Sequence, residues 1–334
     1  MWHWQIKSKE ENSKMWKTIL RRTLVMIPQL FILSVLIFIL AKKMPGDPFT
    51  GLITPQTDPA ALEVLRRKAG LYDPWHIQYF RWMKNAFQGN FGMSYAYKIP
   101  VKTLIGQRAA NTFILSLASI ILTYSIAIPL GVLAGRYQNS FFDKVVVFYN
   151  YISYAIPTFV MSLIMLWLFG YTLGWFPKTG SVTIGLDPGT FKYYIDRIHH
   201  IILPAVTYAL LQTTSTIQYL RNEVIDAKSL DYVKTARSKG VPENKVYSKH
   251  IFRNSILPIA AFFGYTITGL LGGSIFIEMI FGYPGMGNLF ISSISTRDYS
   301  VVTSLILLYG FLTLLGSLLS DIIMSIVDPR IRIE

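Results

Sequence analysis

A hydrophilic segment between residues 221 and 257 carries acidic and basic side chains in close alternation. Its charged groups include Glu223, Asp226, Asp231, Lys234, Arg237, Lys239, Glu243 and Lys245. Gly240 and Pro242 predict two short helices here, because glycine adopts the left-handed backbone that closes a helix and proline suits the start of the next. A helical pair of mixed charge favours docking to another protein. An ordinary solvated loop is the alternative, and the residue types leave both open.

Signatures of catalysis are missing from the sequence. It contains no Gly-x-x-x-x-Gly-Lys-Ser/Thr loop for nucleotide phosphates, no Gly-x-Ser-x-Gly turn and no His-Glu-x-x-His pattern. Cysteine is absent, which excludes disulfides, thiolate metal sites and a cysteine nucleophile. The adjacent His199 and His200 would point in different directions on a helix, so we expect interfacial side chains rather than metal ligands. The sequence therefore predicts no catalytic residue and no metal site.

The elements that position these residues are apolar. Hydrophobic residues make up 52% of the chain and charged residues only 15%, too little polar surface for a soluble globule of 334 residues. Six stretches lack lysine and arginine: 23–41, 112–135, 145–170, 201–218, 258–277 and 301–327. About 20 apolar residues cross a bilayer as a helix, because lipid offers the backbone no hydrogen-bond partner. We therefore expect an all-α polytopic membrane protein with six transmembrane helices.

The only ionisable side chain in these stretches is Asp321, about two turns from the end of the sixth. Secondary transporters and channels usually need ionisable groups at membrane depth, so this pattern disfavours both, although either would also have such spans. We expect Asp321 to contact polar neighbours near the interface rather than to relay protons.

The distribution of basic residues predicts the topology. The net charge of +14 is spread between the apolar stretches, not gathered on a soluble face, and this excludes a nucleic-acid-binding domain. By the positive-inside rule both termini and the loop 220–257 are cytoplasmic. The first stretch is too long for a cleaved signal peptide and is expected to remain as an anchor. The predicted parts are a basic cytoplasmic tail (1–22), a first transmembrane helix (23–41), an extracytoplasmic helical insertion (42–111), a five-helix core (112–327) and a cytoplasmic tail (328–334).

Within the insertion, Asp58-Pro59 and Asp73-Pro74 each offer a capping carboxylate before a proline at the first helical position. The second helix should run from Pro74 to about Gln88 and end at Gly89. Its apolar face, which would lie on the bilayer or pack on the ends of the spans, consists of Ile77, Phe80, Met83 and Phe87. A plain stabilising cap and contact with a substrate-delivering partner both remain open. The external loop 171–200, rich in turn formers, is expected to be irregular.

Neutral polar side chains within the apolar stretches could line a solute pathway. The candidates are Tyr154, Gln212, Thr213 and Ser215. Such groups suit a cargo recognised through its peptide backbone. Ordinary interhelical contacts are the alternative, since serine and threonine often make them in membranes.

The hydrophilic segment also resembles a known family. The run from Asp231 to Gly240, followed by His250, Arg253-Asn254 and Pro258, is similar to the "EAA" coupling loop of binding-protein-dependent ABC importer permeases, in the form seen in oligopeptide/dipeptide-type B subunits. Further matching motifs are Pro45-Gly46-Asp47-Pro48, Gly89 to Ser94, Pro129-Leu130-Gly131, Glu278 with Phe281, Pro284 to Gly287, Arg297-Asp298 and Asp328-Pro329-Arg330. Lys234-Thr235-Ala236 replaces Glu-Ala-Ala and the proline comes late, as is usual in the peptide branch.

The resemblance implies a transmembrane permease subunit of an ATP-driven importer in the bacterial cytoplasmic membrane. Implied partners are a second homologous permease, two cytoplasmic ATPases that bind ATP and Mg, and an extracytoplasmic substrate-binding protein. Oligopeptides or dipeptides are the implied cargo, with nickel or another small solute as the alternative. The implied ATPase-coupling residues are Asp231, Lys234, Thr235, Ala236, Arg237, Gly240, His250, Arg253 and Asn254.

Overall fold

A computed structural model of the chain describes residues 2–43, 59–68, 70–270, 272 and 275–327. These residues form helices joined by turns, with a single isolated bridge between Met93 and Pro100. The all-helical fold class is thereby confirmed for the part described. The helices are α1 (Trp2–Lys43), α2 (Pro59–Lys68), α3 (Trp75–Phe87), α4 (Val101–Arg136), α5 (Phe141–Ala155), α6 (Thr158–Met165), α7 (Phe191–Ala227), α8 (Asp231–Ser238), α9 (Glu243–Lys245), α10 (Phe252–Ser255), α11 (Leu257–Gly269), α12 (Ile275–Ile280), α13 (Met286–Ser295) and α14 (Tyr299–Val327), with π-helical turns η2 (Leu166–Thr172) and η3 (Val246–Ile251).

Three described helices are long and apolar enough to cross a membrane: Ile19–Lys43, Val101–Arg136 and Tyr299–Met324. A fourth crossing follows if the bent pair Phe141–Ala155 and Thr158–Thr172 counts as one span. The structure therefore supports a polytopic membrane protein, and the count of six spans stays a prediction.

The predicted span 145–170 is not one straight helix. Its two halves, α5 and α6 with η2, meet at an angle of 103°. Ile156 is extended there, with ψ of 119°, because a residue before proline is driven out of the helical region. Pro157 then begins the second half. The prediction that this apolar run is helical is correct, but the prediction of one continuous helix is wrong.

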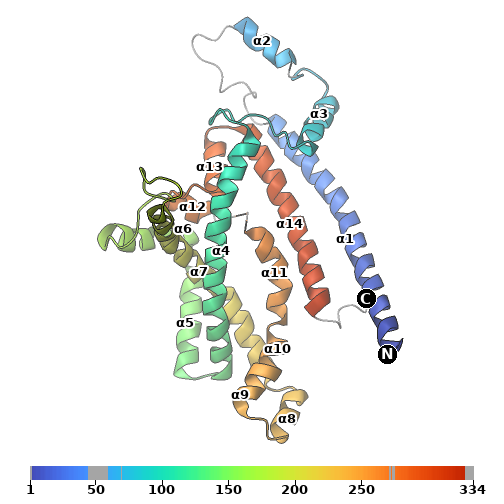
Figure 1. Cartoon of the computed structure of the whole chain (residues 1–334), viewed down its shortest axis with the longest axis vertical. Coiled ribbons are helices and arrows are strands. Elements are labelled where there is room, and N and C mark those ends of the chain that lie inside the picture. Colours follow the sequence, from blue (N-terminus) through green and yellow to red (C-terminus); the bar gives the residue numbers. More distant parts are fainter. Residues whose placement is uncertain (1, 44–58, 69, 271, 273–274, 328–334) are drawn as a thin grey trace.

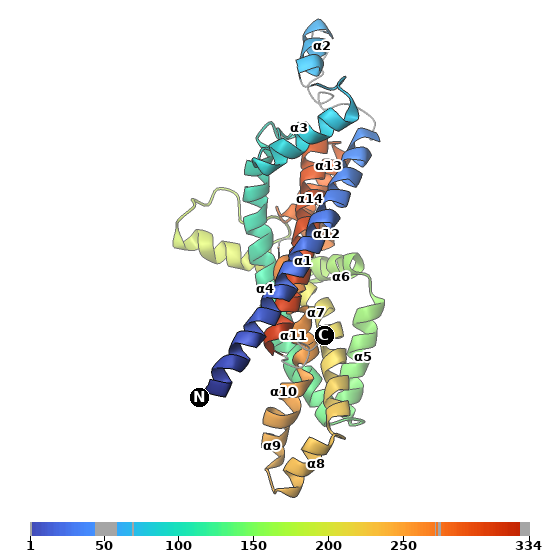
Figure 2. The same ribbon diagram turned by 90° about the vertical axis from the view of Figure 1, so that its right-hand side faces the viewer.

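Two helix pairs form the centre of the fold (Figures 1 and 2). In the first pair α4 packs along α7, and in the second α11 packs along α14, with α1 on the outer side of α14. Gly131 and Gly135 let α4 and α7 approach closely, since a Cβ on Gly135 would lie 2.8 Å from the carbonyl oxygen of Arg221. Gly264 does the same for α11, where a Cβ would lie 2.1 Å from the amide nitrogen of Ser320.

Helix α7 begins ten residues before the predicted span 201–218. The Thr190 hydroxyl accepts a hydrogen bond from the Tyr193 amide and so caps its N-terminus. The expectation of an irregular loop from 171 to 200 is thus wrong after residue 190. His199 and His200 lie on this helix, where His199 Nε2 is 2.8 Å from the Trp175 carbonyl oxygen and His200 Nδ1 is 2.9 Å from that of Asp196.

The predicted span 258–277 is likewise divided, into α11 and the short α12. Glu278 on α12 is fully buried, and its carboxylate accepts hydrogen bonds from the Thr112 hydroxyl (2.7 Å) and the Asn288 amide (3.0 Å). A Cβ on Gly285 would lie 2.3 Å from the Glu278 carboxyl carbon, so the glycine is required by this packing. Two motifs far apart in the sequence also meet in space, because the Ser94 hydroxyl donates to the Asp298 carboxylate.

Helix α1 is longer than the predicted first span, 23–41. It starts at Trp2 and so includes the segment that was expected to be a separate tail. Arg22 Nε on α1 lies 3.0 Å from Asp321 Oδ2 on α14. This ion pair agrees with the expectation that Asp321 contacts a polar partner near the end of its span. The C-terminal segment 328–334 and the motif at residues 45–48 lie outside the described residues.

Helix α3 confirms the second predicted helix of the insertion, with Gly89 at φ +70° beyond its end. Ile77, Phe80 and Phe87 on its predicted apolar face are exposed and do not pack on the ends of the spans, which leaves the bilayer alternative as a prediction. Tyr79 is buried instead, with its hydroxyl 2.7 Å from that of Ser34 on α1. Asp73 does not cap α3, since its carboxylate accepts from Arg81 at 2.6 Å. Helix α2 starts at Pro59 as predicted, and Asp58 lies outside the described residues.

Candidate functional site

The hydrophilic segment forms two short helical pieces at one end of the molecule, opposite α3 and α13 (Figures 1 and 2). Helix α8 ends at Ser238, and Gly240, two residues beyond its end, has a φ of +73°. The Gly240 amide donates to the Arg237 carbonyl (2.9 Å), and the Val241 amide donates to that of Ala236 (3.2 Å). These two bonds form a Schellman motif, in which the left-handed residue satisfies the last carbonyls of the helix. The predicted helix break at Gly240 is present.

After Pro242 the chain continues through α9, η3 and α10 into α11. The two pieces share a hydrophobic cluster with α7, and so form one packed unit rather than a solvated loop. The buried residues of this cluster are Leu220, Val224, Ala227, Val233, Ala236, Val246, Tyr247 and Ile251. We call residues 228–256, packed on this cluster, the coupling unit.

Two ion pairs lie on the outside of the coupling unit. Arg237 Nη2 donates to Glu243 Oε1 at 2.7 Å, which joins α8 to α9 across the turn. This contact lowers the pKa of the Glu243 carboxyl and raises that of the Arg237 guanidinium. Lys234 Nζ lies 3.0 Å from Asp231 Oδ1, and the Thr235 hydroxyl donates to the Asp231 carbonyl oxygen. Exposed pairs of this kind contribute at most about 1 kcal/mol each.

The residues named from the resemblance fall into three groups. Asp231, Lys234, Thr235 and Arg237 are exposed on α8, whereas Ala236 is buried in the cluster below them. Arg253 and Asn254 are exposed on α10, and the Asn254 amide donates to the His250 carbonyl oxygen at 3.0 Å. The exposed α8 residues therefore lie close together on the outside of the coupling unit. His250, Arg253 and Asn254 lie apart from them, in the segment that leads into α11.

A cavity of about 500 Å³ lies between the α4–α7 pair and α11. Its lining combines hydroxyl, amide and aromatic groups with a few apolar ones: Ser116, Ile120, Thr123, Tyr124, Tyr208, Gln212, Ser215, Thr216, Tyr219, Pro258, Ile259, Tyr265, Thr266 and Gly269. The Gln212 side-chain amide donates to the Tyr208 hydroxyl at 2.8 Å. The Ser215 hydroxyl makes only a long contact of 3.4 Å with the Gln212 carbonyl oxygen of its own helix.

Two of the four predicted pathway residues line this cavity, namely Gln212 and Ser215. Thr213 is buried against α5, with its hydroxyl 2.8 Å from that of Tyr149, and Tyr154 is 88% exposed on α5. Sequence reasoning missed Tyr208 and Tyr219. Their spacing with Gln212 and Ser215 places all four on one face of a helix, and this periodicity was readable in the sequence.

Two protein families match most of the chain. Residues 127–333 match the family described as "Binding-protein-dependent transport system inner membrane component", and residues 15–118 match the N-terminal family of such membrane components. The chain belongs to this family. It is therefore a permease subunit of a binding-protein-dependent transport system.

Several curated relatives are similar to this permease over nearly their whole length. The oligopeptide transport system permease protein AppB of Bacillus subtilis is 41% identical over 315 residues, covering 94% of this chain and 98% of the relative. A putative peptide transport system permease protein of Brucella abortus is 35% identical over 316 residues, covering 95% and 99%. The glutathione transport system permease protein GsiC of Escherichia coli is 32% identical over 314 residues, covering 94% and 98%.

Gly240→Val is expected to impair transport by this permease while leaving membrane insertion intact. A Cβ on Gly240 would meet nothing within 4 Å, so the effect arises from the backbone alone. A β-branched residue at positive φ is strained by on the order of 1 kcal/mol or more. Gly240→Asn is the matched control, because asparagine tolerates the left-handed region better. Uptake assays on both variants check this, and equal uptake by Gly240→Val and the native chain would contradict it.

Proposed function

We propose that this permease moves peptides into the cell as one of two permease subunits of an ATP-driven importer. Two cytoplasmic ATPases would bind and hydrolyse ATP with Mg, and an extracytoplasmic binding protein would deliver the cargo. We further infer that the bundle crosses the bacterial cytoplasmic membrane six times with both termini inside. The observation that carries the proposal is the neutral polar and aromatic cavity beside a coupling unit that is fully packed onto the same helix pair.

The chemistry of the cavity favours peptides over the alternatives. Tyrosine, glutamine, serine and threonine side chains can exchange hydrogen bonds with peptide amides whatever the cargo sequence. Among the residues that the structure describes, the cavity lining offers no carboxylate, imidazole or thiolate group, and nickel prefers such ligands. The relatives compared above are named as oligopeptide, peptide and glutathione permeases, and this supports the same cargo class here.

The packing of the coupling unit supports docking to an ATPase. Its outer surface carries two acidic groups, each paired with a basic one, beside further exposed basic side chains, and such a mixed-charge surface suits a polar protein groove. Closure of the ATPases would then move the coupling unit and, through it, the helices around the cavity.

Crosslinking tests the docking directly. Ser238 is exposed at the end of α8, and the native chain has no cysteine to compete. Ser238→Cys should crosslink to the ATPase subunit with a yield that changes when nucleotide binds. Ile184→Cys, at a fully exposed position in the loop before α7, is the control and should not crosslink to the ATPase. Crosslinking of Ile184→Cys but not Ser238→Cys would contradict the proposed orientation.

A further inference from the structure

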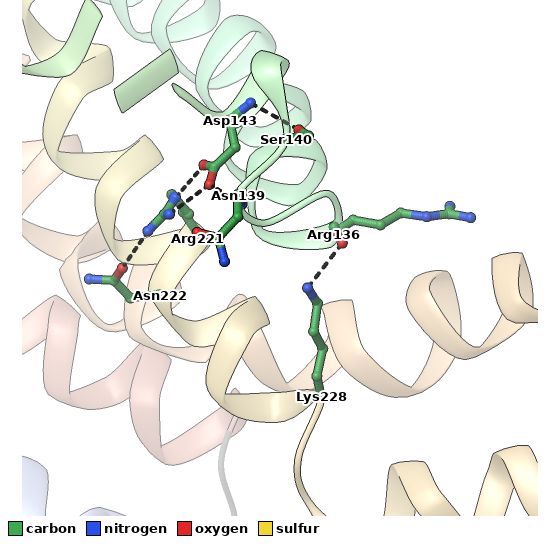
Figure 3. Close-up of polar contacts among 7 residues, drawn as sticks. All are labelled: Arg136, Asn139, Ser140, Asp143, Arg221, Asn222 and Lys228. Carbon is green, nitrogen blue, oxygen red and sulfur yellow. Dashed lines mark hydrogen bonds and ion pairs between the residues drawn. The ribbon is translucent and has the colours of Figure 1, made fainter. Parts of the chain in front are cut away.

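A buried ion pair joins α5 to α7 just above the coupling unit (Figure 3). Arg221 on α7 donates twice to the carboxylate of Asp143 on α5, from Nε to Oδ1 at 2.6 Å and from Nη2 to Oδ2 at 2.8 Å. Asp143 is only 2% exposed. A two-bond contact between guanidinium and carboxylate fixes orientation as well as distance, because both groups are planar.

Asp143 also organises the turn that connects α4 to α5. Its Oδ2 accepts from the Asn139 amide at 2.8 Å, and its own amide donates to the Ser140 hydroxyl at 3.2 Å, which caps α5. Asn139 has a φ of +67°, a conformation that asparagine tolerates. Movement of Arg221 would therefore be passed to the turn and to the first residues of α5.

A second set of contacts fastens the end of α4 to the coupling unit. Lys228 Nζ, at the end of α7, donates to the Arg136 carbonyl oxygen at 2.9 Å. The Arg136 guanidinium donates to Asn244 Oδ1 on α9 at 2.7 Å and lies 4.7 Å from the ring centre of Tyr247, which is buried in the cluster of the coupling unit. The Arg136 backbone therefore contacts Lys228 at the end of α7, and its side chain contacts α9 and η3.

We propose that Asp143 and Arg221, together with Arg136 and Lys228, are positioning residues that make the coupling unit and the cytoplasmic ends of α4, α5 and α7 move as one body. This proposal rests on the proposed function, because it concerns how a displacement by the ATPases reaches the helices. The residue types of the coupling loop give no sign that α5 takes part. Near the coupling unit α5 is tied to α7 by the Asp143–Arg221 pair, and farther along the two helices by apolar packing and the Tyr149–Thr213 hydrogen bond. Loss of that pair should leave ATPase docking in place and weaken transmission to α5.

Two variants separate this role from simple docking. Asp143→Asn keeps the shape and an acceptor for the Asn139 amide but loses the charge, and Arg221→Lys keeps the charge but loses the planar fork. In the complete transporter both should hydrolyse ATP while the amount of peptide moved per ATP falls several-fold. Asp187→Asn makes the same chemical change at an exposed position in the loop before α7 and should behave as the native protein. Native values of peptide moved per ATP in both Asp143→Asn and Arg221→Lys would overturn the proposal.

A distance measurement tests the proposal even if Asp143→Asn and Arg221→Lys fail to assemble into the transporter, because it leaves Asp143 and Arg221 unchanged. Spin labels at Ser238→Cys on the coupling unit and Phe148→Cys on the exposed face of α5 report whether the two move together. We expect the same distance in the nucleotide-free and ATP-bound complexes, and a shift with nucleotide would overturn the proposal. A native complex that does not use ATP for uptake would instead contradict the proposed function, so the two failures are distinguishable.

Discussion

Ser215→Trp is expected to block peptide uptake while ATP hydrolysis by the assembled transporter continues. Ser215 projects from α7 into the cavity of about 500 Å³, opposite residues of α11, and an indole would occupy the space that cargo needs. Because Ser215 is exposed on the wall of an open cavity, the indole can be accommodated without unfolding the bundle and should obstruct passage sterically, so uptake should fall severely. Uptake of a labelled peptide into liposomes, measured beside phosphate release, checks this result.

Ser215→Ala is the matched control for this prediction. It removes the hydroxyl, whose one described contact is the long one to its own helix, and it leaves the cavity open. Uptake by Ser215→Ala should therefore stay close to that of the native chain. If Ser215→Trp transported as well as Ser215→Ala, the cavity would not be part of the pathway.

Gly264→Ala should strongly destabilise the permease, although it adds a single methyl group. The new Cβ would lie 2.1 Å from the Ser320 amide nitrogen and 2.5 Å from its Cα, and backbone atoms cannot rotate away. The α11–α14 contact must then separate. Overpacking of this kind costs about 1–3 kcal/mol, and the better helix propensity of alanine offsets less than about 1 kcal/mol of it. Thermal unfolding of the purified protein in detergent measures the loss.

A graded set of glycine substitutions tests the cause. At Gly316 the nearest atom to a Cβ is the Thr268 hydroxyl oxygen at 2.2 Å, and a side chain can shift more easily than a backbone, so Gly316→Ala should be milder. At Gly106 a Cβ meets nothing within 4 Å, and Gly106→Ala should be neutral or slightly stabilising. An equal loss of stability in all three variants would contradict the packing argument.

Local signals in the sequence were sufficient for several elements. Gly240 and Pro242 predicted the turn between α8 and α9, and Gly89 predicted the end of α3, because both depend on the backbone preferences of one residue. The break at Pro157 and the cap at Thr190 carried similar signals. The signal at Pro157 was missed because the apolar run continues on both sides of it. The cap at Thr190 was missed because turn-forming residues precede it.

Contacts between distant segments could not be predicted in this way. Asp143 and Arg221 are separated by 78 positions, and neither residue type indicates that the other is its partner. The same holds for Glu278 and Thr112, which are 166 positions apart. The cavity is an intermediate case: its α7 face follows from helical periodicity, but its α11 face depends on how α11 packs along α14.

Reconstitution into liposomes tests the central claim most directly. The permease is combined with its second permease subunit, the two ATPases and the binding protein, and uptake of a labelled peptide is followed with ATP inside the liposomes. We expect accumulation that requires both ATP and the ATPase subunits, and none when the permease subunits are reconstituted alone. Uptake at the full rate by the permease subunits without any ATPase would contradict the account and favour a channel or secondary carrier.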